Sequence, residues 1–186
     1  QFIPVLEKNG YVIDVDNFIW NKVCACIKMM EDKGIEPVPI SVNVSRMHVY
    51  QEKFTENLKN MAGEYGIDPK YIPLEITESA FTKEEGSLFK KVQSLQGYGF
   101  KFSMDDFGSG YSSLGMLKSE RVDEVKIDKT FVDDIATDKG KVLLGNVIRM
   151  INELGIDMIA EGVETKEQAD FLKENGCMYA QGYYYY

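Results

Sequence analysis

Apolar positions along the chain follow two different periods, one typical of helices and the other of strands. Five segments place apolar residues on one face at a spacing near 3.6 residues, as an amphipathic helix requires. They are residues 16–33, 51–65, 83–96, 141–154 and 166–175. Three of them are directly followed by a glycine, at the place where a glycine commonly ends a helix. These glycines are Gly34, Gly155 and Gly176. The pattern therefore predicts five helices.

Six shorter apolar runs lie between or after these helices and predict strands. They are residues 39–44, 72–77, 100–105, 122–127, 156–160 and 177–181. Strands that alternate with helices predict a parallel sheet with right-handed crossovers, which forms either an open doubly wound sheet or an eight-stranded barrel. No linker or low-complexity segment interrupts the 186 residues, so a single α/β domain is expected.

Each predicted strand carries a polar residue among or directly after its apolar ones. Strands of an open parallel sheet are buried on both faces and would be continuous aliphatic runs, which these are not. The polar residues at or near the strand ends are Asn43, Glu75, Asp105, Lys126, Glu161 and Gln181. Successive strand side chains point to opposite faces, so these residues would share a side away from the helices. The pattern favours a barrel, whose catalytic face lies at the carboxyl ends of its strands. We expect about two of the eight strands to precede Gln1.

Composition narrows the class of ligand. The formal net charge is −9 and no basic stripe is visible, which argues against binding to a DNA or RNA polymer. No apolar run approaches the roughly 20 residues of a membrane helix, so this domain itself is not expected to contact a membrane. Three cysteines without a Cys-x-x-Cys pair suit a reducing cytoplasm. The single histidine, His48, excludes a histidine-rich metal site, and we expect a surface or capping role for it.

Five of the polar residues form an all-oxygen ligand set that suits Mg²⁺, Mn²⁺ or Ca²⁺. They are Asn43, Glu75, Asp105, Asp106 and Glu161. With Lys126, these acids carry a formal charge of about −3, which cannot be buried without added cations. Two divalent ions that share one carboxylate would stabilise both the attacking and the leaving oxygen of a phosphoryl displacement. Each acid taken alone could instead cap a helix or lie in a solvated loop, and Lys126 could be a structural ion-pair partner.

Asp105 and Asp106 are adjacent, so in a regular strand their side chains would point to opposite faces. Both can reach one site if the strand ends between them, and the glycines at 108 and 110 would permit that break. We therefore expect Asp105 to be the last inward residue of its strand and Asp106 to begin a turned loop. Gly108, Ser109 and Gly110, with residues 111–113, also resemble a phosphate-binding loop at the start of a helix.

Taken together, these segments resemble the EAL-domain family. The matching motifs are SVNVS (41–45), EITE (75–78), DDFGSGYSSL (105–114), VKID (125–128), AEGVET (160–165) and QGY (181–183). They stand in the family's order and extend over nearly the whole chain. The resemblance implies a TIM-like (β/α)8 barrel that hydrolyses cyclic di-GMP to linear pGpG in bacterial signalling, with Mg²⁺ or Mn²⁺ at a two-metal site.

The resemblance also implies a role for each matching residue. The metal ligands would be Asn43, Glu75, Asp105, Asp106 and Glu161, with Asp105 as the bridging carboxylate. The catalytic residues would be Lys126, Glu161 and Gln181, of which Lys126 orients the attacking water or stabilises developing charge. The substrate-loop support would come from Glu78, Asp128, Gly108 and Ser109, with Glu78 steadying the loop after Asp106.

The sequence departs from the family at its start, where the naming Glu-Ala-Leu segment and its metal-ligand glutamate would lie upstream of Gln1. The tail stops before a customary Lys-Pro. We therefore expect residues 1–186 to be a partial EAL domain, less active than its parent. A cyclic di-GMP receptor or a partner-binding scaffold is the alternative function, and a barrel enzyme for another phosphate ester is a more remote one. The resemblance further implies a homodimer, fusion to sensor or GGDEF-type domains, and a cytoplasmic location, including the cytoplasmic part of a membrane-anchored parent.

Overall fold

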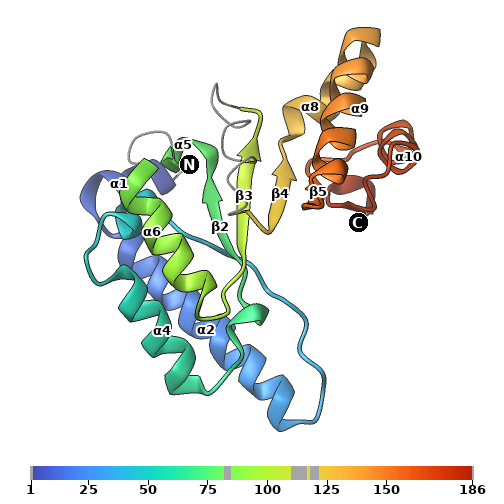
Figure 1. Ribbon diagram of the computed structural model, residues 1–186. Coiled ribbons are helices and arrows are strands. Elements are labelled where there is room, and N and C mark those ends of the chain that lie inside the picture. The colour runs from blue at the N-terminus through green and yellow to red at the C-terminus, as the bar shows by residue number, and fades with distance from the viewer. Residues whose placement is uncertain (1, 82–84, 110–116, 118–121, 186) are drawn as a thin grey trace. The chain divides into compact units, whose positions relative to one another are not determined.

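The computed structural model describes residues 2–81, 85–109, 117 and 122–185 (Figure 1). The chain divides into two compact units. The first contains Gln1–Ile76 and Lys83–Phe102, and the second contains Thr77–Thr82 and Ser103–Tyr186. Both units combine helices with parallel strands, as the alternating sequence periods predict. In the described part of the chain, no helix combines the length and the apolar character needed to cross a membrane.

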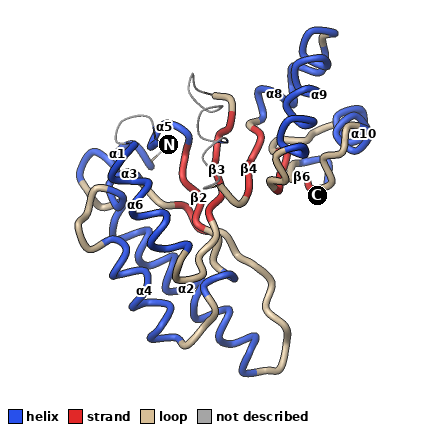
Figure 2. The backbone as a smooth tube through the Cα atoms, in the orientation of Figure 1, coloured by secondary structure: helices blue, strands red, loops and turns tan. Residues whose placement is uncertain are grey.

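The first unit is mainly helical. Its helices are α1 (Ile3–Asn9), α2 (Val12–Asp32), α3 (Arg46–Val49), α4 (Phe54–Tyr65) and α6 (Glu85–Gln96). Helix α4 packs against both α2 and α6, and Figure 2 shows these helices running alongside one another. The strands β1 (Val42–Asn43) and β2 (Leu74–Thr77) are parallel, with Val42 beside Leu74 and Asn43 beside Glu75. The pairing register therefore places Asn43 and Glu75 next to each other.

A buried face of α2 forms much of the core of the first unit. Its buried residues recur at helical spacing: Val12, Asp16, Trp20, Cys24 and Ile27. Helix α4 buries a matching face: Phe54, Leu58, Met61 and Ala62. Side chains three and four positions apart lie on one side of a helix, so α2 and α4 each bury a single face in the core. Asp16 is the charged member of the α2 face, and only 7% of its surface is exposed.

The second unit repeats strands and helices. Its strands are β3 (Phe102–Phe107), β4 (Glu124–Ile127), β5 (Asp157–Ala160) and β6 (Tyr179–Ala180). Its helices are α5 (Glu78–Phe81), α8 (Lys129–Asp133), α9 (Asp138–Glu153) and α10 (Lys166–Glu174), with short 3₁₀ turns at Asp134–Ala136 and Tyr183–Tyr185. Consecutive strands pair in parallel, β3 with β4, β4 with β5 and β5 with β6. Parallel order brings the carboxyl ends of β3, β4 and β5 to the same edge.

Side-chain caps fix where three helices of this unit begin. Asp128 accepts a hydrogen bond from the backbone of Thr130 at the start of α8. Thr137 accepts one from Gly140 at the start of α9, and Thr165 forms a capping box with Gln168 at the start of α10. Such caps satisfy N–H groups that lack a partner in the first turn of a helix. The chain therefore turns from strand or loop into helix at defined residues.

All five predicted helices and all six predicted strands are found among the described residues, which confirms the α/β prediction. The ends differ: the run 39–44 contributes only Val42–Asn43 to a strand, and the run 177–181 only Tyr179–Ala180. The structure adds α1, α3, α5 and α8, which the sequence did not predict. These helices have four to seven residues, too few for a 3.6-residue period to be recognised.

Candidate metal centre

Three carboxylates meet at the carboxyl ends of neighbouring strands in the second unit. Asp105 and Asp106 lie near the end of β3, and Glu161 directly follows β5. One carboxylate oxygen from each residue lies within 4.8 Å of the others. The backbone N–H of Glu161 donates to the carbonyl of Ile127 at 3.0 Å, which ties this residue to the end of β4. The strand ends thus assemble an acidic cluster that could hold a metal ion.

Lys126 of β4 lies within this cluster. Its Nζ is 2.6 Å from Oε1 of Glu161 and 3.2 Å from Oδ1 of Asp105. The side chains of Lys126, Asp105 and Glu161 are only 8%, 14% and 18% exposed. Charges that are shielded from water to this extent interact more strongly than surface ion pairs. We refer to Asp105, Asp106, Lys126 and Glu161 as the acidic cluster with its lysine.

A β-bulge explains how two adjacent aspartates reach one site. Met104 pairs with Val125 and Phe107 pairs with Ile127, so three steps along β3 oppose two steps along β4. Asp106 has a backbone φ of 56°, and it is the non-glycine residue with positive φ in the described part of the chain. Aspartate tolerates this left-handed conformation better than most residues because its short polar side chain can bond locally. An extra residue in one strand breaks the strict alternation of sides.

The expectation that the strand ends at Asp105 is therefore wrong. Strand β3 continues through Asp106 to Phe107, and the change of direction occurs inside the strand. The left-handed residue within the bulge, and not a strand end, allows both aspartate side chains to reach one site. Gly108 follows with a φ of 96°, so the backbone turns a second time just beyond the strand.

The negative charges around Asp106 repel its own negative charge. Burial raises the pKa of the Asp106 carboxyl, and the negative charges of Asp105, Asp128 and Glu78 raise it further, while Lys126 lowers it. One lysine therefore does not balance the acids around it. A cation near Asp106 would stabilise its charged form by the same electrostatic reasoning.

The donor atoms of the cluster fit a hard divalent cation. Oδ1 of Asp105 is buried and forms no hydrogen bond with the described residues, although Lys126 Nζ lies 3.2 Å from it. A buried carboxylate oxygen without a hydrogen bond is costly unless another group coordinates it. Carboxylate oxygens are the ligands that Mg²⁺ and Mn²⁺ prefer. The residues present thus suit such an ion.

Glu78 and Gly108 connect the helix that follows β2 to the turn after β3. The carboxylate of Glu78 is almost fully buried, and its Oε2 accepts a hydrogen bond from the backbone N–H of Gly108 at 3.2 Å. The backbone N–H of Ser109 donates to the carbonyl of Asp106 at 3.1 Å. The turn after the two acids is therefore held by both side-chain and backbone bonds. Gly110 and residues 111–113, the rest of the predicted phosphate-binding loop, lie outside the described residues.

Asp128 and Phe131 form the neighbouring wall of that turn. The backbone N–H of Asp128 donates to the carbonyl of Phe107 at 3.3 Å, and its side chain caps α8. The ring of Phe131 occupies the space where a Cβ on Gly108 would lie. Only glycine fits at position 108, because a side chain there would clash with Phe131 and because the backbone has a positive φ. Asp128 is therefore a capping residue in the structure, with its negative charge near Asp106.

Gln181, the last of the predicted catalytic residues, follows β6 and is exposed. Its backbone N–H donates to the carbonyl of Ala160 at 2.8 Å, and its own carbonyl accepts from Val163 at 3.1 Å. These bonds fix its backbone to the segment on either side of Glu161.

Asn43 and Glu75 belong to the first unit, where Asn43 at the end of β1 lies beside Glu75 within β2. The Asn43 residue is exposed, whereas Glu75 is 8% exposed. The backbone carbonyl of Asn43 accepts a hydrogen bond from Nε1 of Trp20 at 3.0 Å. The predicted ligand set thus falls into a pair in the first unit and a group of three in the second.

The expectation of a surface or capping role for His48 is wrong. His48 is 2% exposed and its ring lies 4.4 Å from the Trp20 ring, centroid to centroid. Its Nε2 is 3.2 Å from the carbonyl of Ile13 and 3.6 Å from Oδ2 of Asp16. Burial is the main cause that lowers the pKa of His48. The sequence offered no signal for this burial, because α3 has only four residues and the partners are about thirty positions away.

Parallel strands, connecting helices and an acidic cluster at the strand ends define an α/β domain of the barrel type with a candidate metal centre. The family model for the EAL domain matches residues 1–186, and this chain belongs to that family. The predicted TIM-like fold of EAL domains is confirmed by the solved structures that it resembles. One of these is the PaMucR phosphodiesterase in complex with c-di-GMP, which is 30% identical and superimposes with a TM-score of 0.92. The match covers 99% of this chain and 75% of the PaMucR chain.

Curated relatives are similar along the whole chain. The signaling protein YkoW of Bacillus subtilis is 34% identical over 186 residues, which are 100% of this chain and 23% of YkoW. The "Probable cyclic di-GMP phosphodiesterase PdeG" of Escherichia coli is 33% identical over 186 residues, which are 37% of PdeG. The chain thus spans less than two fifths of the length of either relative.

Proposed function

We propose that this chain acts in the metal-dependent hydrolysis of cyclic di-GMP to linear pGpG. The observation that carries the proposal is the acidic cluster with its lysine, in which oxygens of three carboxylates lie within 4.8 Å of one another and a nearly buried ammonium group lies beside Asp105 and Glu161. Two relatives support the proposal. PdeG is named a probable cyclic di-GMP phosphodiesterase, and the PaMucR phosphodiesterase has been solved in complex with c-di-GMP.

We assign the metal to the carboxylates of Asp105, Asp106 and Glu161, with Asn43 and Glu75 as further oxygen donors. Asp105 is proposed as the bridging ligand because its buried Oδ1 forms no hydrogen bond with the described residues. A bound Mg²⁺ or Mn²⁺ would polarise the phosphodiester and lower the pKa of a coordinated water molecule. Either ion would suit these donors, and two ions suit the number of acids.

Lys126 would act on the charge that develops during hydrolysis. Its Nζ already lies beside Asp105 and Glu161, so little reorganisation would be needed to place its N–H groups near a water molecule or a phosphate oxygen. Glu161 would hold Lys126 in this position. Gln181, which is exposed at the end of β6, would contribute an amide to orient the attacking water.

The turn after Asp106 would position the substrate. Glu78 holds the backbone of Gly108, and Asp128 anchors the start of α8 beside it. We propose that these contacts, together with Ser109, keep Asp106 in its left-handed conformation when a ligand binds. The negative charge of Glu78 and Asp128 would also favour a cation at this position.

The relatives are longer than this chain, so further domains are part of the proposal. We propose a multidomain protein in the cytoplasm, or the cytoplasmic part of a membrane-anchored one, in which sensor or GGDEF-type domains accompany residues 1–186. A homodimer is the proposed assembly.

The test is incubation of the full-length protein with cyclic di-GMP and Mg²⁺ or Mn²⁺, followed by chromatography for pGpG. The wild type is expected to produce pGpG, and Glu161→Gln is expected to lose most of this activity. Glu153→Gln, which neutralises an exposed glutamate at the end of α9, is the matched control and should retain activity. Tight binding of cyclic di-GMP without pGpG would refute the enzyme and identify a receptor or a partner-binding scaffold.

A further inference from the structure

Helix α2 forms side-chain hydrogen bonds to the backbone at Asn43 and at Ser45, two residues further along the chain. Nε1 of Trp20 donates to the carbonyl of Asn43 at 3.0 Å. Oδ2 of Asp16 accepts from the backbone N–H of Ser45 at 3.1 Å. Asp16 and Trp20 are four residues apart, so they lie on the same face of the helix. One rigid element thus holds the backbone of the proposed metal ligand and that of a residue two positions after it.

The geometry of β1 explains why the Asn43 carbonyl is available to a side chain. The N–H groups of Val42 and Val44 both donate to β2, to the carbonyls of Pro73 and Glu75, at 2.9 Å. Backbone groups of successive strand residues point to alternate sides, so those of Asn43 point away from β2. The indole of Trp20 bonds the Asn43 carbonyl on that side.

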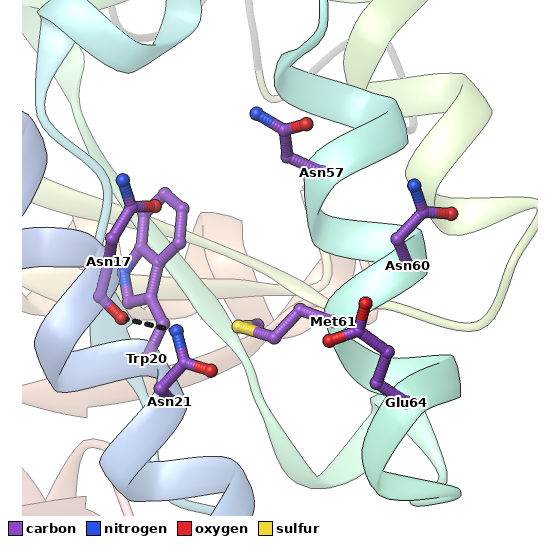
Figure 3. A pocket seen from close by; sticks show the side chains of 7 residues that line it. All are labelled: Asn17, Trp20, Asn21, Asn57, Asn60, Met61 and Glu64. Carbon is purple, nitrogen blue, oxygen red and sulfur yellow. Dashed lines mark hydrogen bonds between the residues drawn. The ribbon is translucent and has the colours of Figure 1, made fainter.

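Trp20 is itself held firmly. It is 2% exposed, and its ring lies 4.4 Å from the ring of His48 and 6.5 Å from that of Phe54. Figure 3 shows Met61 of α4 pointing toward Trp20, with Asn17 of α2 beside the indole. An aromatic ring packed on several sides has little rotamer freedom, so its N–H is a fixed donor.

Asp16 is fixed in the same way. It is 7% exposed, and its Oδ2 lies 3.6 Å from Nε2 of His48 as well as 3.1 Å from the Ser45 nitrogen. A buried carboxylate in the core of a helical unit is costly unless its partners are in place. Its presence on the α2 face therefore calls for an explanation beyond packing, and the bond to Ser45 provides one.

We propose that Trp20 and Asp16 are positioning residues that hold Asn43 in the orientation of an oxygen donor to the metal. The inference rests on the proposed function. Strand β1 has only two residues, and its ladder bonds to β2 on one side leave the Asn43 carbonyl on the other side to Trp20. Donors behind metal ligands set the orientation of those ligands, and their loss commonly weakens metal binding about 10- to 100-fold.

The first experiment measures Mn²⁺ binding directly, by electron paramagnetic resonance of the free ion during titration of the full-length protein. Trp20→Phe keeps an aromatic ring, smaller than the indole, and removes the donor, and we expect it to weaken Mn²⁺ binding about tenfold. In an Asn43→Ala background the same Trp20→Phe change should have little further effect, because the indole acts through Asn43. A merely structural role would give equal losses in both backgrounds and would overturn the inference.

The second experiment uses Asp16. Asp16→Asn keeps an oxygen that accepts from Ser45, so it should bind Mn²⁺ like the wild type, whereas Asp16→Ala should bind several-fold more weakly. Ile27→Val, a core change on the same helix without any polar group, is the control for general loss of packing and should bind Mn²⁺ normally. Equal losses in Asp16→Asn and Asp16→Ala would contradict the positioning role.

The two proposals fail in different ways. If the wild type binds no Mn²⁺, the proposed metal-dependent function is refuted and the positioning role falls with it. If the wild type binds Mn²⁺ and hydrolyses cyclic di-GMP while Trp20→Phe and Asp16→Ala bind Mn²⁺ normally, the function stands and the positioning role alone is refuted.

Discussion

The left-handed backbone of Asp106 leads to a prediction about three substitutions of one residue. A non-glycine residue in this conformation costs roughly 1–2 kcal/mol, less for aspartate and asparagine, whose side chains can bond locally. Asp106 has a φ of 56°. In metal-free protein, Asp106→Ala should therefore be about 1 kcal/mol less stable than Asp106→Asn. Asp106→Gly relieves the strain but adds freedom to the unfolded chain, worth about 0.4–1 kcal/mol, so it should fall between them.

Charge adds a second expectation for the same series. Burial and the neighbouring acids raise the pKa of Asp106, which means that its charged form is disfavoured in the folded protein. Asp106→Asn removes this charge and keeps the backbone preference. It should therefore be at least as stable as the wild type without metal, while its turnover of cyclic di-GMP falls with the loss of a ligand. Stability and activity should change in opposite directions, as is common at functional sites.

The assay is urea denaturation of the full-length protein with a chelator, monitored by a signal from this domain. Asp157, exposed at the start of β5, serves as the control position, where Asn and Ala should differ little. If Asp106→Ala and Asp106→Asn unfold at the same urea concentration, Asp106 is not held in a left-handed conformation. The explanation of the paired acids by a bulge would then be wrong.

Three further predictions concern other residues. Asp105→Asn should lower the rate of pGpG formation about a hundredfold or more because it weakens a metal ligand, and wild-type rates on chromatography would refute the bridging role. Lys126→Met should destabilise the metal-free protein by about 3 kcal/mol, since it leaves buried acids unpaired, and added Mn²⁺ should recover part of this in urea denaturation. Burial lowers the pKa of His48 below its ordinary 6.5, so the unfolded chain binds a proton that the folded protein does not. Stability should therefore fall as the pH decreases below about 6.5, and less so in His48→Gln; the same change in urea midpoint between about pH 7.5 and 5.5 in the wild type and in His48→Gln would contradict this.

The sequence predicted the longer elements well because their hydrophobic periods extend over several turns. Helices α2, α4 and α9 each bury one face at helical spacing, and that spacing is visible in the sequence. The short helices were missed because four to seven residues do not complete two turns. Strands β1 and β6 are shorter than predicted and β3 extends past its predicted end, because an apolar run does not reveal where ladder pairing starts or stops.

The candidate site was predictable where it depends on which residues end a strand, and unpredictable where it depends on backbone geometry. Asp105, Asp106 and Glu161 could be placed near one another because parallel strands end at one edge. The bulge could not be predicted, since one extra residue in β3 relative to β4 leaves the hydrophobic pattern nearly unchanged. The partners of Trp20 and Asp16 also escaped prediction, because contacts between residues more than twenty positions apart arise only from packing.

The ammonium of Lys126 has a consequence for how the site would exchange metal. Because it lies 2.6 Å from Glu161 and 3.2 Å from Asp105, these two acids keep a counter-charge when no ion is bound. The same ammonium repels an incoming divalent cation, so it reduces the affinity that the carboxylates alone would have. A site with its own cation tolerates the empty state and releases its ion more readily. Such a centre would respond to the concentration of free metal around it, and would not retain one ion for the lifetime of the protein.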